Sequence, residues 1–498
     1  MKNLLLFIMI AIISPLELHA QIYVSPNGSD SNSGSIDKPL KTIVAAVSNL
    51  KSPSTIYLRG GVYFSTAKIN LSKIAQPENY YNLFAYPGEK VIIDFSGTSS
   101  DGISLSGKYW HLKSLEIKNA GHNGINISGS YNIIENCEVH NNKNTGVQMG
   151  SGSSSANPGH NLILNCDSYF NFDPPIGGNA DGFGAKWNIG NGNIFKGCRS
   201  FNNSDDGWDF WMADSSIEID SCIAFRNGID IWHTGQVNGN GNGFKLGGNY
   251  IPSSHIIKNC ISFDNAGNTG RGFDENNNTA GQTIYNCTAY RNKAENYYFN
   301  NTLIQGVHTI KNCISYLGSI KIKSGKIQNN SWQGFNVTTN DFLSIDTSLV
   351  LSPRDSNGNL QSNNFFRLAP GSLLIDAGVD VGIPYNGKAP DLGAYESISR
   401  IDLIKQDKVI PFSYNLYQNY PNPFNPATII KFNIEKEGMT NLNIFDILGK
   451  EVMSLVHKNL NTGQYTITVN SNKLKSGIYI YKLESGGKTL SKKMILLK

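Results

Sequence analysis

Residues 165–171 read Asn-Cys-Asp-Ser-Tyr-Phe-Asn, and the spacing of this cysteine and its second asparagine recurs along the chain. The sequence holds seven cysteines, and successive ones are 24 to 38 residues apart. Six of them have an asparagine five positions later: Asn142, Asn171, Asn203, Asn227, Asn265 and Asn292. After the last cysteine, Gly318 takes that place. One offset kept through short, Gly- and Asn-punctuated segments predicts a solenoid with one coil per repeat.

The repeat predicts which residues stack on one another. Parallel strands of adjacent coils lie about 4.8 Å apart, so equivalent residues form ladders. We expect the cysteines to form an internal ladder of free thiols, because their number is odd and stacked identical positions serve packing. We expect the asparagines to form a second ladder, in which amides hydrogen-bond from coil to coil at a turn. An aromatic residue usually stands three positions after the cysteine, as Tyr169 does.

Composition agrees with a strand-rich repeat and excludes one class of partner. The chain has 498 residues, 50 of them glycine, and only 16% are charged. That mixture suits short strands and turns better than long charged helices. The net charge is only +4, and the sequence contains no stripe of lysine and arginine, so we expect no nucleic acid partner.

The N-terminus has the pattern of an export signal. Lys2 precedes an apolar run over residues 4–13, which is too short for a stable membrane anchor. Cleavage after Leu-His-Ala at 18–20 predicts a signal peptide over residues 1–20, so the protein should leave the cytoplasm.

A second domain is predicted after the repeat. Residues 398–413 are expected to be a linker, and residues 414–498 to be a β-sandwich with strands at 428–434, 441–445, 464–469 and 478–483. Residues 419–426 read Asn-Tyr-Pro-Asn-Pro-Phe-Asn-Pro, and residues 492–498 read Lys-Lys-Met-Ile-Leu-Leu-Lys. These segments resemble the C-terminal sorting domain of type IX secretion cargo. The resemblance implies a secretion machinery partner and passage across the outer membrane, followed by cleavage or surface attachment; the alternative is a small sugar-binding or adhesive domain.

The coils that contain the candidate site residues can be aligned on a glycine–aromatic pair. The four aligned segments are Asp181-Gly182-Phe183-Gly184, Asp206-Gly207-Trp208-Asp209, Asn242-Gly243-Phe244-Lys245 and Arg271-Gly272-Phe273-Asp274. This register predicts two columns on successive coils. One contains Asp209, Lys245 and Asp274, and the other contains Asp181, Asp206, Asn242 and Arg271.

Four acids in these coils predict a cation site: Asp181, Asp205, Asp206 and Asp209. Like charges on adjacent strands destabilise a sheet unless a cation neutralises them. Carboxylate oxygens are hard ligands that suit calcium better than zinc. The alternative is a set of solvated acids that cap turns. Lys245 should lie beside the cation, which would lower its pKa and fit it for general base chemistry, unless it only pairs with Asp209 or Asp274.

The run from Asp181 to Lys245 resembles polysaccharide lyase family 9, whose members include pectate lyases and some rhamnogalacturonan lyases. The start of the mature chain, with a short amphipathic helix expected over 44–50, resembles the N-terminal cap of right-handed parallel β-helix enzymes. Residues 389–396 resemble the closing segment of that class. The implied fold is all-β: a right-handed parallel β-helix catalytic domain over residues 21–397, followed by the small β-sandwich.

The resemblance also implies an activity. It predicts β-elimination of pectate, an acidic plant-type polysaccharide, with calcium held by the four aspartates and Lys245 removing the C5 proton. Alternatives are another uronate polymer such as rhamnogalacturonan, a calcium-independent hydrolase with two catalytic carboxylates, and a non-catalytic surface protein. Arg271 is a candidate for binding substrate carboxylate, or else pairs with Asp274, and Lys186 would line the rim. We expect a secreted or surface-bound monomer.

Overall fold

The computed structural model describes residues 20–51, 54–150, 152, 156–235, 237–355, 357–361, 363–397, 405–407, 413–425, 427–470 and 474–497. The predicted signal peptide, apart from Ala20, lies outside these residues, as does most of the predicted linker. Two compact units are present: residues 1–384 with 389–396, and residues 385–388 with 397–498. Among the described residues, no helix has the length and apolar character needed to cross a bilayer.

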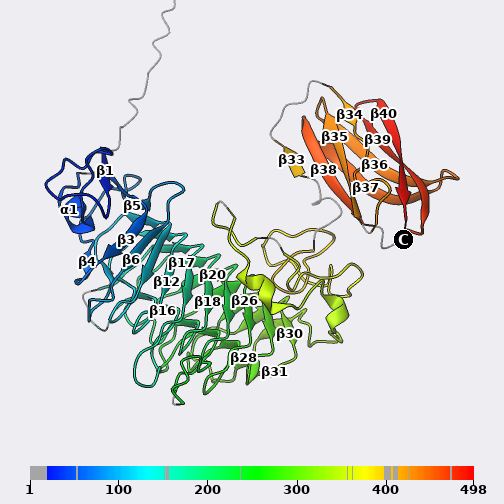
Figure 1. Ribbon diagram of the computed structural model, residues 1–498. Helices are drawn as coiled ribbons and strands as arrows, with labels where there is room; N and C mark the ends of the chain where they lie inside the picture. Colours follow the sequence, from blue (N-terminus) through cyan, green and yellow to red (C-terminus); the bar gives the residue numbers. More distant parts are fainter. Residues whose placement is uncertain are drawn as a thin grey trace, which may run out of the picture. The chain divides into compact units, whose positions relative to one another are not determined.

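Three parallel sheets wind through the first unit as a β-helix, and each coil contributes one strand to each sheet along most of its length (Figure 1). Sheet 1 consists, in spatial order, of β1 (Ala20–Val24), β2 (Ser54–Leu58), β5 (Tyr81–Ala85), β8 (Trp110–Lys113), β11 (Ile133–Glu135), β14 (Leu162–Leu164), β17 (Asn193–Lys196), β20 (Ile217–Asp220), β23 (Ile256–Lys258), β26 (Thr283–Tyr285), β29 (Thr309–Lys311) and β32 (Lys326–Gln328).

Sheet 2 bears the predicted site residues. Its strands are β4 (Ile69–Asn70), β7 (Ile103–Leu105), β10 (Ile125–Ile127), β13 (Val147–Met149), β16 (Phe183–Ala185), β19 (Trp208–Asp209), β22 (Phe244–Lys245), β25 (Phe273–Asp274), β28 (Glu295–Phe299) and β31 (Ser319–Ile322). Sheet 3 consists of β3 (Gly61–Phe64), β6 (Val91–Asp94), β9 (Leu115–Lys118), β12 (Glu138–His140), β15 (Asp167–Tyr169), β18 (Arg199–Phe201), β21 (Ile223–Phe225), β24 (Ile261–Phe263), β27 (Thr288–Tyr290) and β30 (Ile314–Tyr316).

The predicted ladders hold the coils together. All seven cysteines lie in the described part of the chain, and all are free and buried, as predicted from their odd number and their equivalent positions in the coils. The asparagines also stack: Asn171 Nδ2 donates to Asn203 Oδ1 at 2.8 Å, and Asn203 Nδ2 donates to Asn227 Oδ1 at 3.0 Å. Asn296 continues this ladder beyond Asn292. Because each amide also accepts a backbone N–H of the preceding coil, the ladder satisfies buried polar groups at every turn.

A third ladder was not predicted, because its residue types vary. It occupies the turn before sheet 1 and contains Asn132, Asn161, Asn193, His255, Gln282 and His308, which accept backbone N–H groups of the preceding coil. Asparagine, glutamine and neutral histidine each offer one suitably placed acceptor. The common feature is therefore an acceptor atom rather than a residue type.

A short helix covers the N-terminal end of the core. The helix α1 (Ile43–Ser48) lies at the N-terminal end, where Ile43, Ala46 and Val47 are buried in the main core. This matches the predicted short amphipathic cap. The coils end at β32, and the following segment contains the short helices η1 (Thr339–Asp341) and η2 (Thr347–Leu351).

That segment, residues 330–396, packs on the outer face of sheet 3. There the stacked rings of Phe201, Phe225 and Phe263 form a cluster with Phe365 and Leu392. The aromatic residues that stand three positions after the cysteines therefore form a docking face for the chain's own later segment. Leu392 belongs to the predicted closing motif and is fully buried.

The second unit has two antiparallel sheets around a separate core. The first consists of β33 (Lys405–Asp407), β38 (Gly463–Asn470), β35 (Ala427–Ile434) and β34 (Asn415–Leu416), and the second of β37 (Glu451–Leu460), β36 (Gly438–Asp446), β39 (Gly477–Ser485) and β40 (Lys488–Leu496). The predicted all-β fold class is confirmed for both units, although β33, β34, β37 and β40 were not predicted as strands.

Candidate active site

The register predicted from the glycine–aromatic pair is the one observed. Phe183, Trp208, Phe244 and Phe273 are in register on adjacent strands of sheet 2, and their rings stack inside the coil. Alternation then turns the next residues outward: Gly184, Asp209, Lys245 and Asp274 form one column. The aromatic stack thus fixes the height at which each polar side chain leaves the sheet.

Three of the four predicted carboxylates meet. Oxygen atoms of Asp181, Asp206 and Asp209 lie within 4.8 Å of one another, and all three side chains are buried. Asp205 is also buried, but it falls outside this close group. Its Oδ1 accepts the backbone N–H of Asn240 at 2.6 Å.

Backbone and hydroxyl donors orient the carboxylates. Asp181 Oδ1 accepts the N–H of Asp206, and its Oδ2 accepts the hydroxyl of Thr145 at 3.0 Å. Asp206 Oδ1 accepts the N–H of Asn242 at 2.7 Å, whereas its buried Oδ2 accepts no hydrogen bond. Asp209 Oδ1 accepts the N–H of Trp211 at 2.9 Å.

Two lysines reach the cluster from different sides. Lys186 Nζ lies 2.8 Å from Asp181 Oδ2 and 2.7 Å from Asp209 Oδ2. Lys245 Nζ lies 3.1 Å from Asp206 Oδ2 and 3.4 Å from Asp209 Oδ2, and donates to Asn240 Oδ1 at 3.0 Å. Lys186 was predicted only as a rim residue, but its side chain is 10% exposed and forms part of the cluster.

The cluster is electrostatically crowded. Burial raises the pKa of Asp181 and of Asp205, and it raises the pKa of Asp206 to about 7 although Lys245 opposes this shift. Burial would also raise the pKa of Asp209, but Lys186 and Lys245 outweigh it and lower that pKa. Buried carboxylates that raise one another's pKa repel each other when ionised, and a bound cation relieves this repulsion.

The same field acts on Lys245. Burial would lower its pKa, but the carboxylates of Asp206 and Asp209 outweigh burial and raise the pKa well above its usual value. The lysine predicted to be a base is thus held as an ammonium by the protein's own acids. A base role requires that something offset those acids.

A cleft of about 490 Å³ opens over the cluster. Asp205, Asp209, Lys186 and Lys245 line it. Trp187 and Trp211 also line it, with ring centroids 6.0 Å apart in an edge-on arrangement. Sequence reasoning missed both tryptophans, because Trp187 stands four positions after Phe183, whereas Trp211 stands only three after the aligned Trp208. Aromatic faces of this kind are suited to contact with the apolar faces of sugar rings.

Arg271 takes a different position from the lysines. Its Nη1 lies 3.1 Å from Asp274 Oδ2, its Nε lies 2.9 Å from Glu295 Oε2, and its guanidinium stacks over the ring of Tyr298. The ion pair with Asp274, one of the two possibilities for Arg271, is therefore present.

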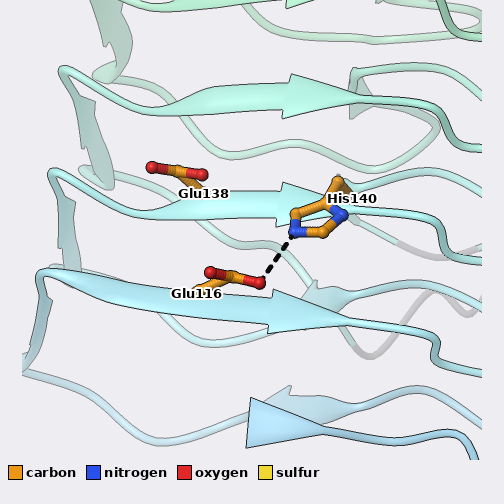
Figure 2. Close-up of side chains that lie close together, drawn as sticks. All are labelled: Glu116, Glu138 and His140. Carbon is orange, nitrogen blue, oxygen red and sulfur yellow. Dashed lines mark hydrogen bonds and ion pairs between the residues drawn. The ribbon is translucent and has the colours of Figure 1, made fainter. Parts of the chain in front are cut away.

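A second group of metal-type ligands lies on the outer face of sheet 3 (Figure 2). It consists of Glu116, Glu138 and His140. Lys90 Nζ pairs with Glu116 at 2.8 Å, and His140 Nε2 lies 3.3 Å from the same carboxylate. In this group Glu116 is only partly buried and Glu138 is exposed, whereas the three aspartates of the cluster on sheet 2 are buried.

Both units match known families. Residues 22–312 match the family described as Pel9A-like, right handed beta helix region, and residues 418–497 match the secretion system C-terminal sorting domain. Pectate lyase L of Dickeya chrysanthemi is 38% identical over 390 residues, which cover 75% of this chain and 90% of that protein.

Two solved structures agree. The crystal structure of pectate lyase Pel9A aligns with a TM-score of 0.72 at 36% identity, covering 76% of this chain and 96% of that one. A rhamnogalacturonan lyase aligns with a TM-score of 0.63 at 26% identity, covering 71% and 97%.

The fold and its cleft therefore define a polysaccharide lyase built on a right-handed parallel β-helix. The chain belongs to the Pel9A-like family and carries a type IX sorting domain, which directs export to the cell surface or beyond.

Proposed function

We propose that this protein is a calcium-dependent pectate lyase in which Lys245 is the general base. The observation that carries the proposal is the group of three carboxylates whose oxygens lie within 4.8 Å, with a lysine on the adjacent coil and a cleft above. The names of the relatives support pectate as the substrate.

The residues present fit a calcium ion. Asp181, Asp206 and Asp209 would hold it, with Asp205 as a fourth acid beside them, and all their ligand atoms are hard oxygens. The buried Asp206 Oδ2 accepts no hydrogen bond and is paired with Lys245 Nζ at 3.1 Å, so this oxygen already attracts a positive charge. Calcium bound there would act as a Lewis acid on a substrate carboxylate and would offset the acids that raise the pKa of Lys245.

The chain's own groups supply the remaining chemistry. Lys245 Nζ, held by Asn240 and facing the cleft, takes the C5 proton of a uronate unit. The electrons of that C–H bond form the C4–C5 double bond. The C4–O bond breaks with its electron pair, and the released oxygen takes up a proton from water as it leaves with the other part of the polymer. Lys186 remains paired with Asp181 and Asp209 and keeps the carboxylates in place.

The activity test uses purified protein with polygalacturonate and calcium. We expect the ultraviolet absorbance of the unsaturated product to increase, and a chelator to abolish the increase. Absence of the unsaturated product on every uronate polymer would refute the lyase proposal. Shortening of the polymer without unsaturation would instead favour a hydrolase, and binding without shortening a surface adhesin.

Lys245 is tested against Lys186, the matched lysine of the same cluster. Lys245→Ala should lower kcat by about 10²- to 10⁴-fold, the usual contribution of a general base. Lys186→Ala should keep measurable turnover, because its ammonium is shared between two acids at 2.7 and 2.8 Å. If Lys186→Ala loses turnover and Lys245→Ala keeps it, the two roles are reversed.

A rhamnogalacturonan is the second candidate substrate, because a rhamnogalacturonan lyase shares the fold at 26% identity. Rhamnogalacturonan, like pectate, contains uronate units whose C5 proton lies beside the carboxylate. Comparing products by mass on homogalacturonan and rhamnogalacturonan fractions separates the two substrates.

A further inference from the structure

The cleft extends well beyond the aspartate cluster. The outward column of sheet 2 runs from Asn126 through Gln148, Gly184 and Asp209 to Lys245. Four steps of about 4.8 Å make about 19 Å, a length of several sugar units. The end far from Lys245 is lined by His122, Asn123, Asn126, Asn144 and Gln148. Among the described residues that line this end, none is a carboxylate.

An acid lies behind this end and organises it. Asp101 Oδ1 is 2.7 Å from His122 Nδ1 and accepts from Asn123 Nδ2 at 3.0 Å, while its Oδ2 accepts from Asn126 Nδ2 at 2.9 Å. The side chain of Asp101 is 15% exposed, so it faces these donors rather than the cleft. Asn144 Nδ2 lies 3.3 Å from the opposite ring nitrogen of His122. The result is a fixed imidazole with neighbouring amides at the wall of the cleft.

Comparison with two similar pairs shows what is special about His122. His111 pairs with Glu135 at 2.8 Å from sheet 1, and His140 with Glu116 at 3.3 Å from sheet 3 (Figure 2). Their side chains are 20% and 11% exposed, whereas that of His122 is 53% exposed. Of the three rings, only that of His122 lines the cleft.

We propose that His122, positioned by Asp101 and flanked by Asn126, Asn144 and Gln148, forms a distal subsite for a uronate unit of the polymer cleaved at Lys245. This inference rests on the proposed function, because it assumes an acidic polysaccharide lying along the coils. A bound sugar would replace Asn144 Nδ2 at His122 Nε2, and the ring and amide N–H groups would then match its carboxylate and hydroxyl oxygens. Among the described residues that line this end, none is a carboxylate, which favours an acidic sugar. The hydrogen bond with Asp101 also raises the pKa of His122, which favours the cationic ring. Asp101 is a positioning residue.

The test compares chain lengths. His122→Ala should raise KM for long oligogalacturonates about tenfold (~1.4 kcal/mol), leave kcat unchanged, and have no effect on oligomers too short to reach from Lys245 to His122. Asp101→Asn should raise KM in the same length-dependent way. His111→Ala, which removes a similar ring outside the cleft, should leave KM unchanged. Equal KM values for His122→Ala and the parent on long oligomers would overturn the subsite.

A binding experiment separates this inference from the proposed function. Calorimetry with a long oligogalacturonate in the Lys245→Ala background measures affinity without turnover. Weaker binding on adding His122→Ala supports the subsite even if another residue proves to be the base. Unchanged binding, or no binding by the Lys245→Ala parent, refutes the subsite. The absence of unsaturated product from the wild-type protein refutes only the lyase proposal.

Discussion

Asp181 and Asp206 are each followed by a glycine, as are Asn242 and Arg271 at the equivalent positions of the next coils, and the structure gives the reason for one of these glycines. A Cβ added at Gly207 would lie 2.5 Å from the carbonyl oxygen of Gly243 and 3.0 Å from Asn227 Nδ2. The glycine therefore lets the strand carrying Asp206 and Trp208 approach both the next coil and the asparagine ladder. The Asp-Gly-aromatic pattern reflects packing on one side and chemistry on the other.

We expect Gly207→Ala to lower the free energy of unfolding by about 1–3 kcal/mol, the usual cost of overpacking. Urea denaturation measures this loss. Because the contact involves backbone, relief by a side-chain rotation is not available. A variant as stable as the parent would show that the adjacent coils can move apart enough to accommodate the added methyl group.

The aspartates can be tested by calcium binding apart from activity. Asp209→Asn should lower calcium affinity at least tenfold, because Asp209 belongs to the three-carboxylate group. Calorimetric titration of calcium measures the effect. Asp264→Asn, which breaks the ion pair with Arg291 on sheet 3, is the matched control and should bind calcium as the parent does. Equal affinities for both variants would mean that the cation binds elsewhere.

At the scale of elements, the asparagine ladder explains how short strands suffice. Strands of sheet 2 such as β19 and β22 are only two residues long. Asn203 accepts the N–H of Asn171 and donates to Asn227 Oδ1 and Ser200 Oγ, all while fully buried. Each ladder amide thus replaces strand hydrogen bonds that the short strands cannot make.

Asn203→Ala should therefore destabilise the protein by about 1–3 kcal/mol or more, since it leaves several buried groups unpaired. Asn191→Ala, at an exposed position, should change stability by less than about 0.5 kcal/mol. Chemical denaturation of both variants gives the difference. Similar stabilities would indicate that buried water replaces the amide.

The third ladder, which contains His255, predicts a pH dependence of stability. His255 is fully buried, and burial lowers its pKa to about 3, below the ordinary value of 6.5. Its Nδ1 accepts the N–H of Ile217, so the folded state keeps the ring neutral. The unfolded chain binds a proton below about pH 6.5 and the folded protein does not. Stability should therefore fall as the pH decreases from about 6.5 toward 3, by up to about 1.4 kcal/mol per unit.

His255→Asn, which keeps an acceptor of the type found at Asn193, should remove this contribution. The measurement is the difference in unfolding free energy between variant and parent from pH 7 to pH 4. If that difference does not change with pH, the proton uptake occurs elsewhere.

At the scale of the whole molecule, the two units have separate cores. The β-helix core and the cluster on sheet 3 contain residues up to Ala394, while the core of the second unit begins at Leu416. The family matches divide at the same region, 22–312 and 418–497. Folding of the catalytic unit therefore should not require the sorting unit.

A chain ending at residue 397 should keep the kcat and KM of the full protein and unfold in one transition. In cells, it should not reach the surface or medium, because it lacks the sorting domain. Activity assays and cell fractionation check the two statements. Loss of activity in the shortened chain, with the fold preserved, would place a catalytic role in the second unit.

Most of the coil geometry could be predicted from the sequence. The glycine–aromatic pairs alone gave the register of Asp209 on Lys245, because strands stacked in parallel at a fixed spacing align equivalent residues. The ladder at His255 and Gln282 could not be predicted in this way, since the shared feature is an acceptor atom. Nor could the position of Lys186, whose long side chain reaches Asp181 and Asp209 from outside their columns.

The sequence by itself determined the solenoid, its free thiols, the columns of acids and the presence of a second β domain, because each follows from a period or a local pattern. Only the tertiary structure decided which acids meet, how Asn240, in the loop just before β22, contacts Lys245, and where residues 330–396 pack. The physical reason is that stacking fixes neighbours only for residues on the repeated strands. Loops and side chains between strands have no fixed neighbour, so their contacts depend on the folded surface that they meet.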